Sequence, residues 1–250
     1  TGVVTALRMI GTTQMLSGRL VVAESRLAAA SRLYDPERDR ALLASTGQEP
    51  GVSIDCFMAH TLLLRGFPDR ARRHIDAAVR VATELRHALT LAYVVGHETV
   101  FWLFAGDGER AVVPAERNRT FSEIHSIRSW EIWTFGFAVV LHSLAGRFED
   151  ALAAAERARP QFEASGTGLF LPLMLSGELR SLIAIGRYAS CEERLREVFA
   201  RIETSGEHWI EADIHRIEGD LRVAEEGAQG NIYKEGLEYA RAGQTKRRRW

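Results

Sequence analysis

The sequence predicts an all-α fold: a right-handed superhelical solenoid of antiparallel helix hairpins that repeats about every 40 residues. Two observations lead to this prediction. Gly66, Gly106, Gly146 and Gly186 follow one another at intervals of 40 residues, and the residues on both sides of each glycine have helical periodicity. A hairpin of two helices cannot bury both of its faces alone, so successive hairpins are expected to stack. Residues 1–250 are therefore predicted to form a single domain of about six hairpins.

The first hairpin is predicted to turn at Gly18, which is followed five residues later by a small residue, Ala23. A helical stripe continues from there through Leu27 and Ala30. The interval from Gly18 to Gly66 is 48 residues, eight more than the period. We place the extra residues in the stretch 36–51, where "DPERDR" and "GQEPG" indicate turns and predict a lengthened loop.

The central hairpins combine an apolar first helix with a second helix that carries a stripe of small residues. The segments "DCFMAHTLLL" and "WTFGFAVVLHSLA" are apolar enough for helices that are buried on most of their surface. After Gly146, the residues Ala151, Ala155 and Ala158 lie at i, i+4 and i+7, so a neighbouring helix can approach closely. The equivalent stripe of the hairpin at Gly66 is Ala71, Ile75 and Ala78. Each glycine is expected at the turn between two helices, where a residue without Cβ adopts positive φ.

The later hairpins depart from this pattern at three places. Pro114 lies about one turn into a second helix and is expected to kink it. Cys191 takes the position of the small residue after Gly186. One further period places a turn near Glu226 and Gly227, so a degenerate sixth hairpin is predicted to run to the carboxyl end.

The order of glycine, small residue, larger residue and small residue resembles the tetratricopeptide repeat, with about six residues added to its period of about 34. Gly11 and Gly219 match the glycine in the first helix of that repeat, and Trp102 matches its turn-facing aromatic residue. Val139 and Leu179 stand where that glycine is expected. The resemblance implies a repeat of the tetratricopeptide kind that functions in protein binding.

The amino-acid composition indicates which classes of partner and which cell compartment are expected. The 32 basic and 33 acidic residues nearly cancel, so no overall field favours nucleic acid or an anionic membrane. No apolar run reaches the length of a membrane span, and the amino terminus lacks the layout of a signal peptide. Cys56 and Cys191 are too few for a disulfide framework, which favours a cytoplasmic protein. The chain begins at Thr1 rather than Met, so we expect it to be a segment of a longer protein.

Longer phrases carry a more specific resemblance. The segments "LYDPERDR", "LLLRGFPDRARRHIDAAVRVATELRHALTLAY" and "GEHWIEADIHRIEGDLRVA" are similar to the helical-repeat region that follows an AAA/STAND-type ATPase in large bacterial signalling proteins. Those proteins carry either a class III adenylyl cyclase domain or a winged-helix DNA-binding domain. The resemblance implies a regulatory domain for signal transduction, whose partners are the upstream ATPase and effector domains. The chain has no G-x-x-x-x-G-K-[ST] phosphate loop, so only the regulatory arm is expected within it.

The sequence contains only weak evidence for a catalytic or metal site. His208, Glu211 and His215 lie at i, i+3 and i+7, so one helical face could present three metal ligands. The same segment recurs for packing reasons in the resembled region, and we expect no metal and no cofactor. His97 begins an H-E-x-x-H-like stretch but Phe101 replaces its second histidine. The "KRRRW" run at 246–250 is interpreted as a helix end rather than a nucleic-acid contact. No catalytic residues are predicted, and the segment is not expected to be an enzyme.

The register of 40 residues predicts which side chains share the concave surface of the stack. Five polar and aromatic residues are expected to project into one groove for a protein partner or small effector: Tyr93, His97, Trp133, Arg180 and Arg216. Trp133 would be an aromatic anchor, and the arginines would bind a carboxylate or phosphate. The alternatives are an oligomerisation scaffold, in which Leu7 and Ile10 belong to an apolar end hairpin, and an enzyme built on the same scaffold.

Overall fold

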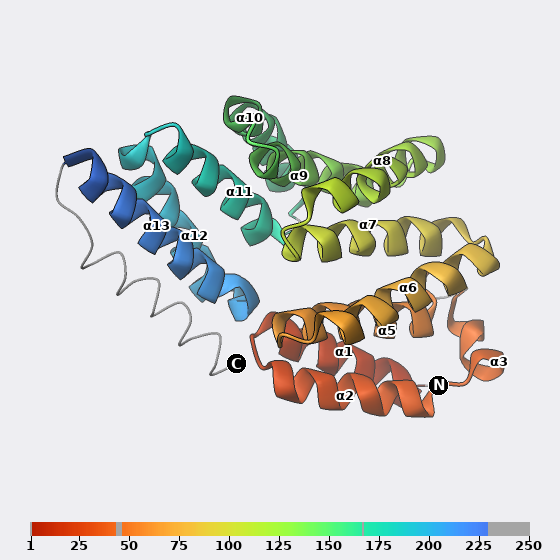
Figure 1. The fold of residues 1–250 in the computed structure, drawn as a ribbon. Coiled ribbons are helices and arrows are strands. Elements are labelled where there is room, and N and C mark those ends of the chain that lie inside the picture. The colour runs from red at the N-terminus through yellow and green to blue at the C-terminus, as the bar shows by residue number, and fades with distance from the viewer. Residues whose placement is uncertain (1, 44–46, 167, 230–250) are drawn as a thin grey trace. The chain divides into compact units, whose positions relative to one another are not determined.

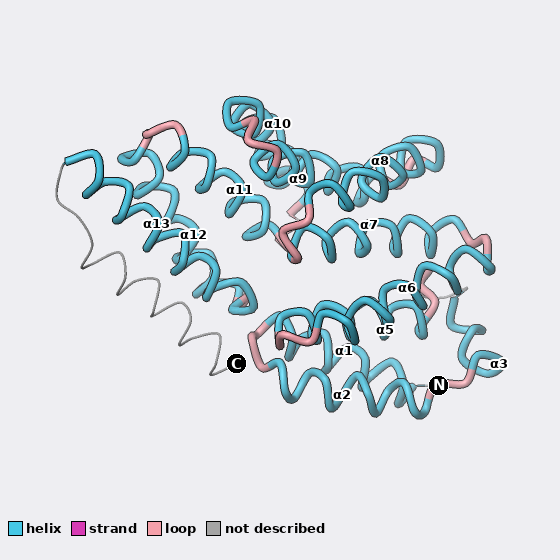
Figure 2. The backbone as a smooth tube through the Cα atoms, viewed as in Figure 1, coloured by secondary structure: helices cyan, strands magenta, loops and turns pink. Residues whose placement is uncertain are grey.

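The computed structural model describes residues 2–43, 47–166 and 168–229. Within these residues it contains twelve α-helices and two short 3-10 helices, and no strand (Figure 1). The predictions of at least ten helices and no sheet are confirmed for this part of the chain. Short loops join the helices (Figure 2). The chain divides into two compact units, residues 1–134 and 135–250, and the boundary falls inside helix α9.

The first unit consists of three complete helix hairpins and an insertion. The helix pairs are α1 (Gly2–Leu16) with α2 (Leu20–Leu33), α5 (Pro50–Leu64) with α6 (Pro68–Leu85), and α7 (Ala88–Phe104) with α8 (Gly108–His125). The insertion holds α3 (Pro36–Asp39) and the 3-10 helix η1 (Arg40–Leu42). The first turns of α9 (Arg128–Leu144) complete the unit.

The second unit continues the same pattern. It contains the remainder of α9, then α10 (Phe148–Ser165), α11 (Leu171–Ala184) and α12 (Tyr188–Ser205). The 3-10 helix η2 (His208–Ile210) leads into α13 (Glu211–Gln229). No described helix of either unit is long and apolar enough to cross a membrane.

The five predicted glycine turns are confirmed. Each glycine lies between two helices and has a positive φ: 73° at Gly18, 86° at Gly66, 73° at Gly106, 71° at Gly146 and 76° at Gly186. At Gly66 the backbone N–H of the glycine donates to Leu63, 3.0 Å away, and that of Phe67 donates to Leu62, 2.9 Å away. These bonds satisfy the last carbonyls of α5, and a residue with a Cβ would be strained at this φ.

The small-residue stripes are buried, as predicted. Ala151 and Ala158 of α10 are fully buried, and so are Ala71 and Ala78 of α6. Glycine permits the same close approach between α1 and α2, where a Cβ at Gly11 would lie 2.7 Å from Cγ of Leu27. Short side chains at the contacts let the helix axes come close together, which fixes the pairing of each hairpin.

Two local predictions were wrong. The extra residues do lie in the stretch 36–51, but its described part is not a simple loop, because Asp35 accepts hydrogen bonds from the backbone N–H groups of Glu37 and Arg38 and caps the short helix α3. Gly227 does not mark a turn, since α13 continues through it to Gln229. Pro114 does lie inside α8, as predicted.

Other predictions are not decided by the described residues. The second helix of the sixth hairpin and the basic run at 246–250 lie outside them. The superhelical path and its hand, and the organisation of the chain as one domain, stay predictions.

Candidate functional site

The structure buries three of the five predicted groove residues. Tyr93 and His97 of α7 and Trp133 of α9, all in the first unit, are 6%, 2% and 7% exposed. The prediction that these side chains face an open groove is therefore wrong. Gly96 lacks a side chain, and Trp130 packs directly over it in contact with the ring edges of Tyr93 and His97. The aromatic residues of α7 and α9 thus pack against one another instead of lining a free surface.

A chain of polar contacts runs through this buried cluster. Arg8 of α1 donates from Nη1 to Ser53 Oγ of α5 over 3.1 Å, and Ser53 Oγ lies 2.8 Å from the Tyr93 hydroxyl. Ser53 and Tyr93 are one period apart in the sequence, so this contact supports the predicted 40-residue register within the first unit. The Tyr93 ring lies against that of His97, with 4.3 Å between centroids.

His97 and His60 form a buried histidine pair at the end of this chain. His60 Nε2 lies 2.9 Å from His97 Nδ1, so one ring donates a proton and the other accepts it. Burial lowers the pKa of His60 to about 3. Burial, and then the neighbouring His60, lower the pKa of His97 well below its usual value. Both imidazoles are therefore neutral at pH 7, and their hydrogen bond joins α5 to α7 inside the core.

The two predicted groove arginines lie in the second unit and already have partners there. Arg180 Nη2 of α11 lies 2.7 Å from Asp213 Oδ2 of α13, and Arg216 Nε lies 3.2 Å from the other oxygen of the same carboxylate. Arg216 also pairs with Asp220 at 2.6 Å. The side chains of Arg180 and Arg216 are 34% and 36% exposed. A ligand anion would have to compete with Asp213 for both arginines, and their role in binding stays a prediction.

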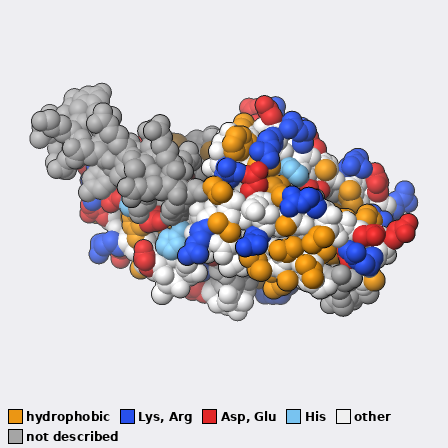
Figure 3. All heavy atoms as spheres, turned by 90° about the horizontal axis from the view of Figure 1, so that it is seen from below, with side chains coloured by type: hydrophobic (Ala, Val, Ile, Leu, Met, Phe, Trp, Pro, Cys, Tyr) orange, Lys and Arg blue, Asp and Glu red, His pale blue; other side chains and the backbone are white. Residues whose placement is uncertain are grey.

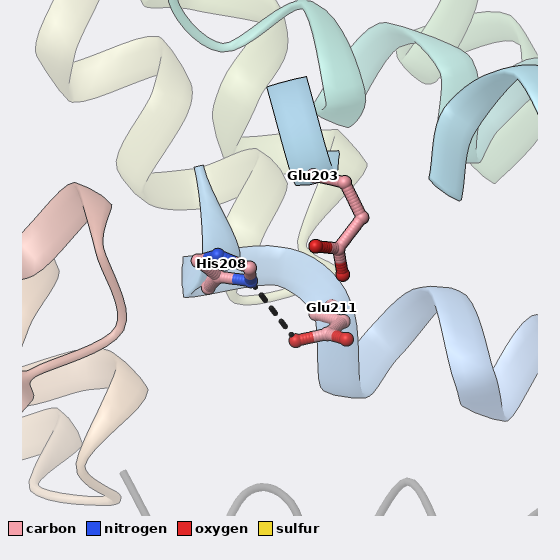
Figure 4. A group of neighbouring side chains, drawn as sticks. All are labelled: Glu203, His208 and Glu211. Atoms are coloured by element: carbon pink, nitrogen blue, oxygen red, sulfur yellow. Dashed lines mark hydrogen bonds and ion pairs between the residues drawn. The ribbon is translucent and has the colours of Figure 1, made fainter. Parts of the chain in front are cut away.

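The candidate metal ligands at the start of α13 form a histidine–glutamate cluster. Glu211 is buried and lies between two histidines, with its Oε2 3.2 Å from His208 Nδ1 and its Oε1 3.8 Å from His215 Nε2. Glu203, an exposed residue of α12, approaches as well, so that ligand atoms of Glu203, His208 and Glu211 lie within 4.8 Å of one another (Figure 4). Sequence reasoning missed Glu203 because the turn between α12 and α13 brings it close. His208 Nδ1 lies within hydrogen-bond distance of Glu211, as His215 Nδ1 does of Glu218. The expectation that no metal binds here stays a prediction.

Sequence reasoning also missed a cavity in the second unit. A cavity of about 400 Å³ lies among α10, α11 and α12. Its lining combines four apolar side chains with four charged ones: Phe162, Leu171, Met174 and Leu175, and Arg159, Glu163, Glu197 and Arg201. The volume is within the range typical of small-molecule sites, roughly 300–1,000 Å³. No signal in the sequence marks this cavity, because its lining side chains come from three different helices and none of them is among the five predicted groove residues.

A buried carboxylate organises the charges beside this cavity. Glu178 of α11, with 8% of its side chain exposed, lies 3.0 Å from Arg159 Nη2 and 3.1 Å from Arg194 Nε. Two arginines therefore neutralise a carboxylate that would otherwise be unstable inside the protein. Glu197 on the next turn of α12 contacts Arg194 and lies 3.9 Å from Arg159 Nη1.

Comparison with known proteins returns no family model and no curated protein that matches the chain. The fold and the geometry of these sites therefore carry the functional argument.

Proposed function

We propose that the chain is a non-catalytic helical-repeat module, which acts as the sensor or protein-interaction arm of a larger bacterial signalling ATPase. The effector of that ATPase is a cyclase or a DNA-binding domain. The observation that supports the proposal most directly is the regular series of helix hairpins, whose glycine turns lie 40 residues apart at 66, 106, 146 and 186. Stacked hairpins of this kind provide extended surfaces for binding rather than a fixed catalytic centre.

The chemistry of the buried groups favours binding over catalysis. The thiols of Cys56 and Cys191 are both buried. Burial raises the pKa of Cys191 to about 12 and that of Cys56 well above its usual value, so neither is a reactive thiolate at pH 7. The histidine pair of His60 and His97 is likewise enclosed among aromatic rings. A nucleophile or general base must reach its substrate, and these groups are packed into the core.

A binding arm regulates an attached enzyme only if its ligand distinguishes two states. A ligand that binds better when the arm adopts one arrangement on the ATPase shifts the equilibrium toward that arrangement. The shift cannot exceed the difference in binding free energy between the two states.

The test of this proposal uses the complete protein. The reading frame upstream of Thr1 should encode an ATPase domain, and removal of residues 1–250 should change its rate of ATP hydrolysis. A matched control deletes only residues 230–250. An upstream frame without an ATPase, or an ATPase whose rate is the same with and without residues 1–250, would overturn the proposal.

A second candidate function is an oligomerisation scaffold, because α1 and α2 expose apolar side chains. Val3, Met9 and Ile10 of α1 are 62%, 56% and 46% exposed, and Val21 and Val22 of α2 are 60% and 42% exposed. Figure 3 views the molecule from the side on which these helices lie in Figure 1, and hydrophobic side chains gather on that face. Exposed apolar surface of this kind favours contact with a further copy of the chain.

A further inference from the structure

We infer that the cavity among α10, α11 and α12 binds a small organic monocarboxylate with an apolar body, and that Arg201 is the residue that binds its carboxylate. The inference deepens the proposed function, on which it rests, by naming the chemical class of effector that the arm would sense. It rests on three features of the second unit: the apolar lining of the cavity, the absence of a salt bridge to Arg201 among the described residues, and the ion pairs that the other charged residues form.

The lining provides an apolar surface for the body of the ligand. Phe162, Met174 and Leu175 are 6%, 3% and 5% exposed, and Leu171 at the start of α11 is half-buried. Phe162 is itself held in place, since a Cβ at Gly136 would lie 3.1 Å from its Cζ. Burying the apolar part of a ligand against such a surface contributes about 25 cal/mol per Å² of area removed from water.

Arg201 is the lining arginine for which the described residues provide no salt bridge. Its Nε is buried and has no hydrogen-bond partner among the described residues, which also provide no ion pair for its guanidinium. Its charge does act on the buried Glu207: burial raises the pKa of this carboxyl group, and the nearby Arg201 lowers it by a smaller amount. Because this Nε is buried, a carboxylate in the cavity would bind the terminal N–H groups of the guanidinium through charge-assisted hydrogen bonds.

Gly168 makes room for this guanidinium. A Cβ at Gly168 would lie 2.7 Å from Arg201 Nη2, so any larger residue would displace the head of the arginine. The conformation of Arg201 at the wall of the cavity therefore depends on the absence of a side chain in the loop between α10 and α11.

The other charges select a ligand with a single negative charge. Arg159 and Arg194 are held by Glu178 and Glu197, which leaves Arg201 as the lining arginine without such a pairing among the described residues. Glu163 and Glu197 are exposed carboxylates of the same lining. They would repel a second negative charge on the ligand, so a monocarboxylate is favoured over phosphate or a nucleotide.

The experiment is a calorimetric titration of the full chain with octanoate, phenylacetate, octanamide and inorganic phosphate. We expect at least one of the two carboxylates to bind, and octanamide and phosphate to bind about tenfold more weakly or not at all. Arg201→Gln should weaken carboxylate binding about tenfold. Arg196→Gln, which changes an exposed arginine of the same helix outside the cavity, should leave it unchanged.

A second variant guards against a change of fold. Gly168→Ala keeps the charge of Arg201 but moves its flexible head, so it should also weaken carboxylate binding while the circular dichroism spectrum and melting temperature stay close to those of the wild type. Complexes with dissociation constants in the millimolar range are still measurable at a ligand concentration of about 10 mM. Failure of both carboxylates to bind at that concentration would overturn the inference. So would equal binding of octanamide, tighter binding of phosphate, or equal affinities of the wild type and Arg201→Gln.

The outcomes separate this inference from the proposed function. If the carboxylates do not bind but removal of residues 1–250 changes ATP hydrolysis, the proposed regulatory role is supported and the proposed ligand class is wrong. If they bind through Arg201 but the deletion has no effect on the ATPase, the proposed carboxylate site is supported and the proposed regulatory role is wrong.

Discussion

The buried pair of His60 and His97 couples the stability of the first unit to pH. Both histidines have a pKa in the folded state below that of the unfolded chain, which is about 6.5. At a pH above that value neither state binds a proton at these sites, and the stability is fully present. As the pH falls below about 6.5 the unfolded chain takes up protons that the folded chain does not. Stability is therefore lost progressively toward a pH of about 3, the pKa of His60.

We predict that urea unfolding at pH 5 requires less denaturant than at pH 7, and that His97→Gln reduces this difference. Each neutral histidine contributes a slope of about 1.4 kcal/mol per pH unit in this range. Comparing the slopes of the wild type and the variant cancels the contribution of carboxylates that titrate in both. His125→Gln serves as the control because His125 is exposed. Equal slopes for the wild type and His97→Gln would contradict the prediction.

Between helices, the contacts within a hairpin and between successive hairpins depend on side chains of small volume. Ala151 is fully buried, and a Cβ at Gly177 of α11 would lie 3.0 Å from the Val140 Cα of α9. Helices that approach this closely cannot move apart locally to accept a larger side chain without disturbing their neighbours.

We predict that Ala151→Leu lowers the free energy of unfolding by about 1–3 kcal/mol through overpacking. Ala153→Leu on the same helix is the matched control, because Ala153 is only half-buried and should tolerate the change better. Chemical denaturation of the two variants measures the difference. If Ala151→Leu were as stable as the wild type, the stripe of small residues on α10 would not be closely packed against a neighbouring helix.

Trp133 illustrates how burial changes the expected effect of a mutation. Its ring lies 4.9 Å from that of Trp130 and 6.5 Å from that of His97, measured between centroids. Trp133→Ala would therefore leave a cavity between α7 and α9 rather than merely remove a binding contact. We predict a loss of about 3–5 kcal/mol in the free energy of unfolding. Phe135→Ala, at a residue of the same helix that is 37% exposed, should cost less. A Trp133→Ala variant as stable as the wild type would contradict this assignment.

At the scale of the whole molecule, the balance of charge and the exposed apolar surface decide how copies of the chain meet. The formal net charge is −1, so electrostatic repulsion between copies is weak. In the hairpin of α1 and α2, some apolar residues are packed in the core and others are exposed. Leu7 packs against Val4, Ala30 and Ile54, whereas Ile10 is exposed. The expected apolar face on this hairpin is thus present, and Ile10 rather than Leu7 belongs to its open part.

We predict that the chain self-associates at high concentration and that Ile10→Asp combined with Val21→Asp reduces this association. Both positions are exposed, so the substitutions should leave the fold intact. Light scattering over a range of concentrations measures the effect, with Val113→Asp as a control at another exposed valine, on α8. A wild type that stays monomeric throughout would remove the support for an oligomerisation scaffold.

The sequence by itself determined the helix hairpins and their turns. Gly66, Gly106, Gly146 and Gly186 mark turns because positive φ is a local property of the backbone, and the regular spacing makes each occurrence support the others. The buried alanine stripes follow from helical periodicity in the same way. A capped short helix within residues 36–51 escaped prediction, because turn residues and helix caps are the same residue types.

Only the tertiary structure decided which side chains remain available to a ligand. Tyr93, His97 and Trp133 were assigned to a groove from their register, but register names a helix face and does not show what covers that face. Trp130, packed over Gly96, encloses them. Arg180 and Arg216 share Asp213, whereas Arg201 extends beside the bare backbone of Gly168 and forms no salt bridge with a described residue. Burial and pairing depend on side chains from different helices that meet only in the folded chain, and a single sequence records no distance between them.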